Sequence, residues 1–399
     1  MLSQIYATLD ERYPKMVEIR RHLHMHPELS FQEVQTARYI ANFYKNLGVD
    51  VRTEVGGNGV VATIKGGKPG PTVALRADFD ALPIDDEKNV PYKSKVPGVM
   101  HACGHDGHTA TLLVLGEVLH LLKDELHGNF VLIHQHAEEY APGGAASMIK
   151  DGCLDGVDVI FGTHLWATEP TGTIQYRTGP IMAAADRFEV TIKGSGGHGA
   201  QPHKTKDSVV IASQFIMNLQ QIVSRRVNPI DSAVISVGNF EAKNAFNVIA
   251  DSAKLIGTVR TFNENVREQI EMDIEKVLKG TCLTSDADYD YLYDRGYPAV
   301  VNHKDETELL VKIASEVPGV NNIKETEPQM GGEDFAYYLQ HVKGTFFFTG
   351  AKEQHVTHPY PHHHPRFDFD ENAMLIAAKA LTRVSIAYQQ ENSVLESVK

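Results

Sequence analysis

Histidine is unevenly distributed along this 399-residue chain. Ten of its 20 histidines lie between His101 and His203, and five more lie between His355 and His364. Imidazole titrates near neutral pH and is the commonest metal ligand in proteins, so histidines grouped beside cysteine and carboxylates indicate a metal site. A histidine taken alone is more often exposed or hydrogen-bonded in a core, so the clusters carry the argument rather than the total.

The densest group of candidate ligands is the segment 101–108, His-Ala-Cys-Gly-His-Asp-Gly-His. Cys103 and His105 are two residues apart in a loop that precedes a predicted helix, so both can face one point. A helix N-terminus and a metal ion both stabilise a thiolate. The alternative is a thiol nucleophile with a histidine base. Residues this close in sequence rarely form such a pair, so metal ligation is the preferred interpretation.

Further candidate ligands come from three separate segments. Glu138 and Glu139 follow an apolar predicted strand, and adjacent carboxylates there point to different sides, so one can bind a metal while the other acts as acid or base. His164 follows the apolar run 159–162 in the same way, and a triple histidine occupies 362–364. A folded metal site gathers its ligands from distant segments like these.

The number of candidate ligands favours two metal ions over one. A single catalytic zinc uses about three protein ligands and keeps one position open. Five are available here, with Asp78 and Asp80 in addition: Cys103, His105, Glu139, His164 and one histidine of 362–364. We therefore predict two divalent ions, about 3.5–4 Å apart and sharing a water. Cysteine favours zinc, carboxylate and imidazole also suit manganese, and cobalt and nickel fit as well.

The sequence lacks the motifs of several other enzyme classes. It contains no H-E-x-x-H of a single-zinc protease and no G-x-S-x-G nucleophile elbow. It also contains no P-loop and no G-x-G-x-x-G after the first predicted strand. Single-zinc proteases, serine hydrolases and nucleotide-binding enzymes therefore lose support.

The elements that must position these residues alternate between helix and strand in the first half of the chain. Apolar residues at helical spacing predict a helix over 5–24, and Ser30 with Glu33 resembles a capping box that opens a second helix, which ends at Leu47 before Gly48. Four short β-rich runs follow, with a helical stretch over 109–123 between the second and third: 60–64, 73–77, 130–134 and 159–162. This alternation predicts an α/β sheet with helices on its faces.

The pattern changes between Asp186 and about Arg295. There the order is strand, helix, strand, strand, helix, strand, which is the ferredoxin-like unit. The predicted elements are 188–193, 208–223, 233–240, 253–261, 266–279 and 288–293. After them we predict a helix over 306–316, a buried strand over 346–348 and a final helix over 371–388.

The predicted fold is therefore an α/β catalytic domain built from both ends of the chain, 1–184 and 296–399. Its central mixed sheet is flanked by helices, and an α+β ferredoxin-like domain, 185–295, is inserted into it. Such an insert has exposed strand edges and a helical face, so it can serve as a lid or as a dimer surface.

Composition excludes several classes of partner. Lys and Arg number 38 against 51 Asp and Glu, and the formal charge of −13 repels nucleic acid and anionic membranes. Three scattered cysteines predict a reducing compartment or metal chemistry rather than a disulfide framework. Residues 1–15 show no secretory signal, and no apolar run approaches the roughly 18 residues of a membrane span, so we expect a cytoplasmic protein.

Six segments, in order over nearly the whole chain, together resemble the M20 metallopeptidase family. They are closest to its amidohydrolase branch, which comprises N-acyl-amino-acid, hippurate and indoleacetyl-amino-acid hydrolases. The segments are Arg76–Pro83, His101–His108, Ala137–Glu139, Gly196–His203, Gly331–Phe335 and His363–Phe367.

The resemblance implies a role for each matching residue. The metal ligands would be Cys103, His105, Glu139, His164 and His363. His363 is preferred to His364 because the branch pattern places this ligand two residues before the proline. Glu138 would be the catalytic base.

The resemblance also assigns residues of the insert. His198 would reach the active site of a partner subunit, while Asn247 and Arg260 would hold the carboxylate of the substrate. The insert itself would form a lid and a homodimer interface. An acidic protein can select an anionic small molecule in this way, because a placed arginine and two cations set the local field.

The expected activity is metal-dependent hydrolysis of the amide bond of small N-acyl-L-amino acids, such as N-acetyl or N-benzoyl derivatives. Two alternatives remain open. An aminopeptidase or dipeptidase of the same family would cleave substrates with a free α-amine. A catalytically silent relative would bind a metal or a ligand without turnover, although an intact Glu138 and ligand set argue against it.

Overall fold

The computed structural model describes residues 1–396 and divides into two compact units. The first consists of Met1–Ile181, Val300–Glu327 and the chain from Asp334 on. The second consists of Met182–Ala299 and Pro328–Glu333. The predicted insert, 185–295, therefore lies within the second unit, and both chain ends contribute to the first.

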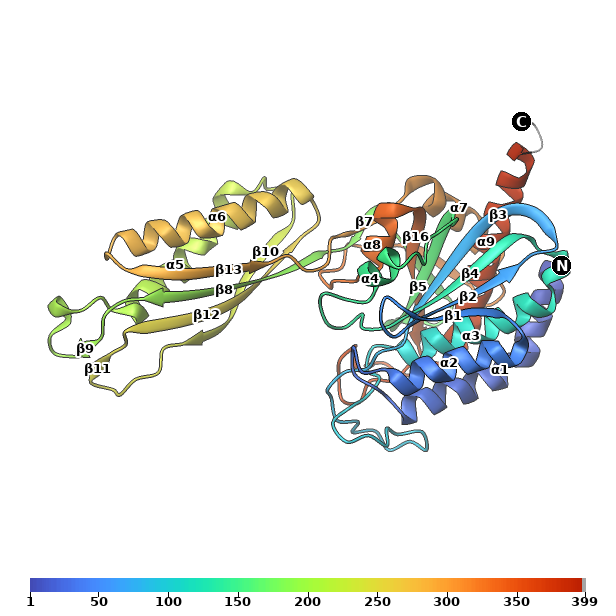
Figure 1. Cartoon of the computed structure of the whole chain (residues 1–399), viewed down its shortest axis with the longest axis horizontal. Coiled ribbons are helices and arrows are strands. Elements are labelled where there is room, and N and C mark those ends of the chain that lie inside the picture. Colours follow the sequence, from blue (N-terminus) through green and yellow to red (C-terminus); the bar gives the residue numbers. More distant parts are fainter. Residues whose placement is uncertain (397–399) are drawn as a thin grey trace. The chain divides into compact units, whose positions relative to one another are not determined.

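The first unit is built on an eight-stranded mixed sheet with the strand order β1-β2-β4-β3-β5-β16-β6-β15 (Figure 1). Its strands are β1 (Asp50–Val55), β2 (Gly59–Lys65), β3 (Lys68–Asp78), β4 (His127–Gln135), β5 (Val159–Pro170), β6 (Thr173–Tyr176), β15 (Asn322–Glu325) and β16 (Lys343–Lys352). The four central strands, β4, β3, β5 and β16, are mutually parallel. Their carboxyl ends therefore lie at one edge of the sheet, which is where α/β proteins place their sites.

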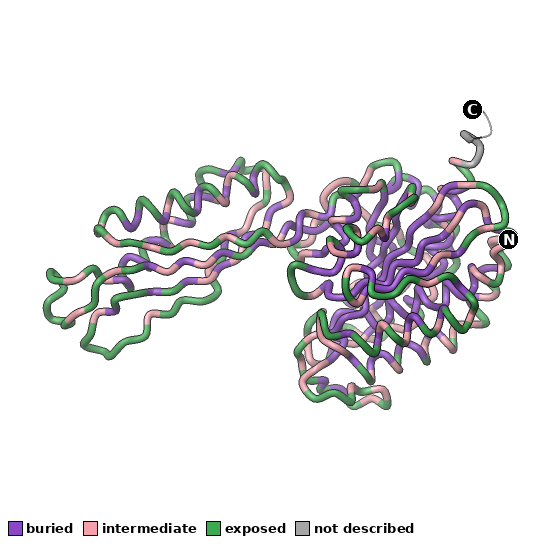
Figure 2. Tube along the Cα trace, in the orientation of Figure 1, coloured by how far each residue is buried: buried purple, intermediate pink, exposed green. Residues whose placement is uncertain are grey.

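Helices cover both faces of this sheet. Those on one face share a core with Val73, Leu75 and Phe161, and they are α1 (Leu2–Met25), α2 (Val34–Leu47), α3 (His105–Leu121), α7 (Lys304–Ala314) and α9 (Asn372–Glu396). On the other face α8 (Phe335–His341) packs so closely that a Cβ on Gly162 would lie 2.6 Å from the Phe335 ring. Figure 2 shows the central strands buried along most of their length.

Helix α3 is deeply buried on the face of the sheet that also carries α1, α2, α7 and α9. Every residue from His105 to Leu119 is buried, because α3 lies between the sheet and the helices α1 and α9. Its first residue is a predicted metal ligand. The packing of this helix therefore fixes the start of the ligand segment against the carboxyl end of β3.

The capping box predicted at Ser30 and Glu33 is wrong. Helix α2 begins at Val34, and neither predicted side chain caps it. The carboxylate of Glu28 does so instead, accepting hydrogen bonds from the backbone amides of Gln35 and Thr36 at 3.1 and 2.8 Å. Ser30 donates to Asp80 and Glu33 accepts from Ala137, because both side chains turn away from the helix towards the carboxyl edge of the sheet.

The second unit has the predicted β-α-β-β-α-β order. Its elements are β8 (Ala184–Lys193), α5 (Ser208–Gln221), β10 (Ala233–Glu241), β12 (Ser252–Thr261), α6 (Glu264–Leu283) and β13 (Asp288–Asp294). The antiparallel sheet has the order β10-β12-β8-β13, which is the ferredoxin-like arrangement (Figure 1). The two helices pack on one face around Phe188, Phe215 and Ile270. A short ribbon of β9 (Gly197–His198) and β11 (Val248–Ile249) extends from one end.

The short outer elements of the first unit escape sequence prediction. Strand β1 is exposed at all but two of its positions and carries charged residues at three of six, so it lacks the apolar run that marks a buried strand. The remaining short elements are α4 (Ala145–Lys150), β7 (Gly179–Met182) and β14 (Val300–Asn302). No helix in the described part of the chain is long and apolar enough to cross a membrane.

Candidate metal centre and active site

The predicted ligands of the first unit converge at the carboxyl edge of its parallel strands. Asp78 ends β3, Glu138 and Glu139 follow β4, and His105 begins α3. His164 differs from the expectation that it follows a strand. Because β5 continues to Pro170, His164 lies inside this strand and projects its side chain from there.

Cys103, His105 and Glu139 form one cluster. One ligand atom of each lies within 4.8 Å of the others, and the His105 Nε2 to Glu139 Oε1 distance is 3.7 Å. Both of these atoms are buried and make no hydrogen bond within the described residues. Orphaned polar atoms that face one another in a buried site are costly unless a cation lies between them. The donor set of thiol, imidazole and carboxylate therefore fits a divalent transition metal such as zinc.

Asp80 sets the orientation of His105. The Nδ1 atom of His105 lies 3.0 Å from the backbone oxygen of Asp80 and 3.1 Å from its Oδ1. With a proton on Nδ1 shared with Asp80, the ring turns Nε2 towards Glu139, which is the usual orientation of a metal-bound histidine. Burial would lower the pKa of His105, but Asp78 and Asp80 outweigh it and raise the pKa to about 10. This excess of negative charge favours a bound cation.

A second cluster shares Cys103 with the first and adds His164 and His362. The Cys103 Sγ to His164 Nε2 distance is 3.4 Å, and the His164 Nδ1 lies 2.9 Å from the backbone oxygen of Leu165. His164 therefore also keeps its Nε2 directed at the candidate site. The His362 ring packs against those of His164 and Trp166, with centroid distances of 5.1 and 5.0 Å. The sequence pattern indicates a ligand within the triple histidine 362–364 but does not single out His362.

His363 reaches the first cluster from its other side. Its Nε2 lies 3.3 Å from Glu139 Oε2, so one carboxylate oxygen faces His105 and the other faces His363. His364 turns elsewhere: its ring stacks on Tyr360 with centroids 4.5 Å apart, and its Nδ1 accepts the amide hydrogen of Arg366 at 3.0 Å. Of His363 and His364, His363 is therefore the one that contacts Glu139.

The electrostatics of Cys103 argue against the thiol nucleophile. Burial raises the pKa of this thiol well above its ordinary value, and the carboxylates of Glu139 and Glu138 raise it further. A nucleophilic cysteine needs a lowered pKa and a positive environment. These surroundings disfavour a free thiolate at Cys103, whereas a bound cation would stabilise one.

Glu138 lies beside the clustered ligands. Its side chain is buried, and its Oε2 is 3.9 Å from His105 Nε2. Adjacent Glu139 directs its own carboxylate between His105 and His363. Both neighbouring carboxylates therefore lie close to His105, and that of Glu139 also reaches His363.

A buried network supports the site from behind. His108 Nδ1 lies 2.6 Å from Asp78 Oδ1, while its Nε2 accepts the amide hydrogen of Leu165 at 2.9 Å. Arg76 donates to Asp78 at 2.5 Å and to Asp334 at 2.8 Å. The sequence pattern predicts Asp78 and Asp80 only as additional ligands. Their short spacing after a predicted strand was the available signal, but only the fold shows that both orient histidines.

The three remaining predicted residues lie in the second unit. His198 and Asn247 are exposed and adjoin one another, because the amide of Gly199 donates to the Asn247 backbone oxygen at 2.7 Å. Arg260 lies on β12 opposite Ala185 of β8, and its guanidinium donates to the backbone oxygens of Met330 and Val259 at 3.1 Å each. It forms no ion pair with a carboxylate in the described part of the chain.

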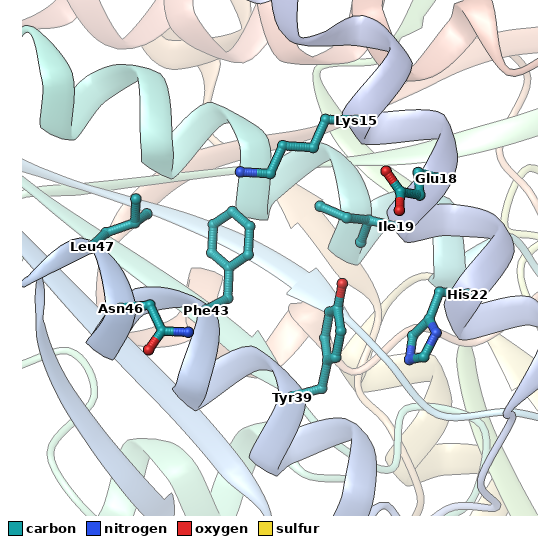
Figure 3. Close-up of a pocket in the computed structure, with 8 residues that line it drawn as sticks. All are labelled: Lys15, Glu18, Ile19, His22, Tyr39, Phe43, Asn46 and Leu47. Carbon is teal, nitrogen blue, oxygen red and sulfur yellow. The ribbon is translucent and has the colours of Figure 1, made fainter.

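One of the described grooves lies away from this site. It lies between α1 and α2, has a volume of about 410 Å³ and is lined by side chains that include Lys15, His22, Tyr39 and Phe43 (Figure 3). Lys15 is already paired there, with its Nζ 2.6 Å from Glu117 Oε2 and 4.8 Å from the Phe43 ring centroid. The groove brings together no group of metal ligands, so its volume alone does not indicate a catalytic role.

Comparison with known proteins agrees with the geometry. The model of peptidase family M20/M25/M40 matches residues 74–386. A Bacillus subtilis (strain 168) relative named as an amidohydrolase is 64% identical over 97% of this chain and 98% of its own length. An N-acyl-L-amino acid amidohydrolase of Geobacillus stearothermophilus is 45% identical over 75% of this chain and 81% of its own.

A solved structure from Bacillus subtilis is described as a dinuclear metal-binding peptidase of the M20 family. It superposes with a TM-score of 0.82 at 34% identity and covers 96% of this chain and 99% of its own. The family match extends over most of the chain and includes the clustered cysteine, histidines and glutamates. The protein therefore belongs to peptidase family M20 and is an amide-bond hydrolase of the amidohydrolase type.

Proposed function

We propose that this protein hydrolyses N-acyl-L-amino acids to a carboxylate and a free amino acid, with two divalent metal ions in each subunit. One observation carries the proposal. The buried His105 Nε2 and Glu139 Oε1 face each other without hydrogen-bond partners among the described residues, directly beside Glu138. The name of the Geobacillus stearothermophilus relative supports the choice of substrate class.

Cys103, His105, Glu139, His164 and His363 would hold the ions, with Asp80 orienting His105. Bound divalent ions lower the pKa of a water molecule and polarise the amide carbonyl. Glu138 takes a proton from the attacking water and returns it to the departing amine. Its burial beside the ligands keeps bulk water away from this proton transfer.

Arg260 and Asn247 bind the carboxylate of the amino-acid portion, and His198 donates to the oxygen on which negative charge develops. Arg260 suits this role because its described hydrogen bonds go to neutral oxygens, which leaves its charge for a substrate carboxylate. The exposure of His198 and Asn247 suits residues that meet a substrate from outside their own unit.

The spacing within the second unit supports a homodimer. The His198–Asn247 ribbon extends from the end of the sheet where Lys193 pairs with Ser252, whereas Arg260 pairs with Ala185 at the other end. The strand from Ser252 to Arg260 spans roughly 27 Å at about 3.4 Å per residue. One copy of the chain cannot bring both ends to one small substrate. We therefore propose that a second copy supplies the His198 ribbon.

The test is a substrate panel with metal analysis. The purified protein, loaded with Zn²⁺ or Mn²⁺, is assayed on N-acetyl and N-benzoyl amino acids and on dipeptides with a free α-amine. The proposal expects release of free amino acid from the acylated substrates and two ions per chain. Preference for the dipeptides would identify a dipeptidase. No turnover of either class by the fully metal-loaded protein would overturn the proposal.

A further inference from the structure

The residue that precedes the two glutamates of the site has an uncommon backbone conformation. Ala137 has φ of 53°, in the left-handed region that residues with a side chain rarely adopt. This conformation turns the chain sharply after β4 and directs Glu138 and Glu139 to the site. Such a conformation persists only where the surrounding structure holds it in place.

Two buried carboxylates hold the backbone on either side of Glu138. Glu33 Oε1 accepts the amide hydrogen of Ala137 at 2.8 Å, and Asp80 Oδ2 accepts that of Glu139 at 2.9 Å. Glu33 is 0% exposed, and its second oxygen accepts a hydrogen bond from Asn58 Nδ2 at 3.0 Å. The amides that flank the proposed base are thus both bound by side chains from distant parts of the sequence.

The side chain of Glu33 does not stabilise the helix that it precedes. It stands at the N-cap position of α2 yet makes no side-chain capping bond, because Glu28 caps that helix. Its segment is instead held against the site. Leu29 forms a β-bridge with Ala81, and the Phe31 ring lies edge-on to that of His136, with centroids 6.0 Å apart.

We propose that Glu33 is a positioning residue for the hydrolysis described above: its hydrogen bond holds Ala137 in the left-handed conformation and so aims Glu138. The inference rests on the proposed function for the reaction that Glu138 performs. The hydrogen bond and its effect on the backbone can be measured without any substrate.

Two substitutions separate the reach of the side chain from its charge. Glu33→Gln keeps an oxygen at the same distance and removes the charge, and Asn58 can rotate its amide to remain bonded. Glu33→Asp keeps the charge but is one methylene too short to reach Ala137. Glu28→Ala is the matched control, because it removes two amide hydrogen bonds of the same segment without touching Ala137.

The first readout is hydrogen exchange of the segment 135–139, measured on the full-length protein by mass spectrometry. We expect Glu33→Asp to lose protection at the Ala137 amide, whereas Glu33→Gln and Glu28→Ala keep it. The second readout is turnover with metal content. Here kcat of Glu33→Asp should fall roughly 10- to 100-fold, as for other residues that orient ligands. KM should stay near the wild-type value, because substrate contacts are unchanged.

The outcomes distinguish this inference from the proposed function. If the wild-type protein cleaves no acylated amino acid, the proposed function fails, and the exchange data alone decide whether Glu33 holds Ala137. Unchanged protection in Glu33→Asp would overturn the inference. So would full kcat in Glu33→Asp despite lost protection. A Glu33→Gln variant that keeps the protection of Ala137 yet is as slow as Glu33→Asp would also overturn it, since the hydrogen bond alone would then not account for turnover.

Discussion

At the scale of single residues, hydrogen bonds to one nitrogen of a histidine ring decide which other nitrogen faces the candidate metal site. Asp80 binds the Nδ1 of His105, and Leu165 binds the Nδ1 of His164, so both rings direct Nε2 inward. Glu139 offers one oxygen to His105 and the other to His363. The same chemistry that makes these atoms costly without a cation makes them suitable ligands with one.

Glu138→Gln tests the proposed base. The substitution preserves shape but removes the group that accepts the proton, so we expect kcat to fall roughly 10²- to 10⁴-fold with metal content unchanged. Turnover and metal analysis of the same preparation provide the measurement. Activity close to that of the wild type would contradict the assignment of Glu138 as the base.

His363→Ala tests the choice between neighbouring histidines. We expect metal affinity to fall by more than the roughly 10–100-fold that loss of an outer-shell partner costs. His364→Ala is the control, because its ring binds Tyr360 and the Arg366 amide instead. Metal titration against a chelating dye measures both. If His362→Ala lost an ion while His363→Ala bound its full complement of metal, the C-terminal metal ligand would be His362 instead of His363. That residue lies in the cluster of Cys103, His164 and His362.

At the scale of elements, the segment that precedes α2 serves two purposes. Glu28 caps the helix, and this allows Ser30 and Glu33 to turn to the carboxyl edge of the sheet. Sequence spacing could not separate these roles, since Ser followed three residues later by Glu is the pattern of a capping box. The pairing of Leu29 with Ala81 decides the outcome, because it brings this segment beside Asp80.

Glu28→Ala should destabilise the first turn of α2 by about 1 kcal/mol, the usual cost of a lost cap. Ser30→Ala should leave that turn unchanged, because the Ser30 hydroxyl donates to Asp80. Hydrogen exchange of the segment 34–38 in the two variants measures the difference. Equal loss of protection in both would restore the capping-box interpretation.

At the scale of the whole molecule, the two units carry different parts of the proposed chemistry. The first holds the candidate metal ligands and base, and the second holds His198, Asn247 and Arg260. The two ends of the second unit's sheet are too far apart for one small substrate. Assembly of two copies is therefore part of the proposed active site.

Mixing two inactive variants tests this assembly. Glu138→Gln and His198→Ala, combined under conditions in which subunits exchange, should recover part of the wild-type rate, because a mixed dimer contains one site with both residues intact. Glu138→Gln mixed with Glu139→Ala is the control and should recover none, since both changes lie in one unit. With exchange demonstrated, absence of recovery in the first mixture would show that His198 does not act across subunits.

The sequence by itself determined the order of the main helices and strands, the ferredoxin-like insert and the residue types of the candidate metal site, because local periodicity and ligand chemistry depend on short segments. Only the tertiary structure decided that His164 lies within β5, that Glu28 rather than Ser30 caps α2, and that Asp80 and Glu33 hold the backbone around Glu138. These are pairings between segments far apart in sequence. The strength of these pairings depends on which buried groups the folded chain brings within hydrogen-bonding distance. A local sequence pattern does not contain this information.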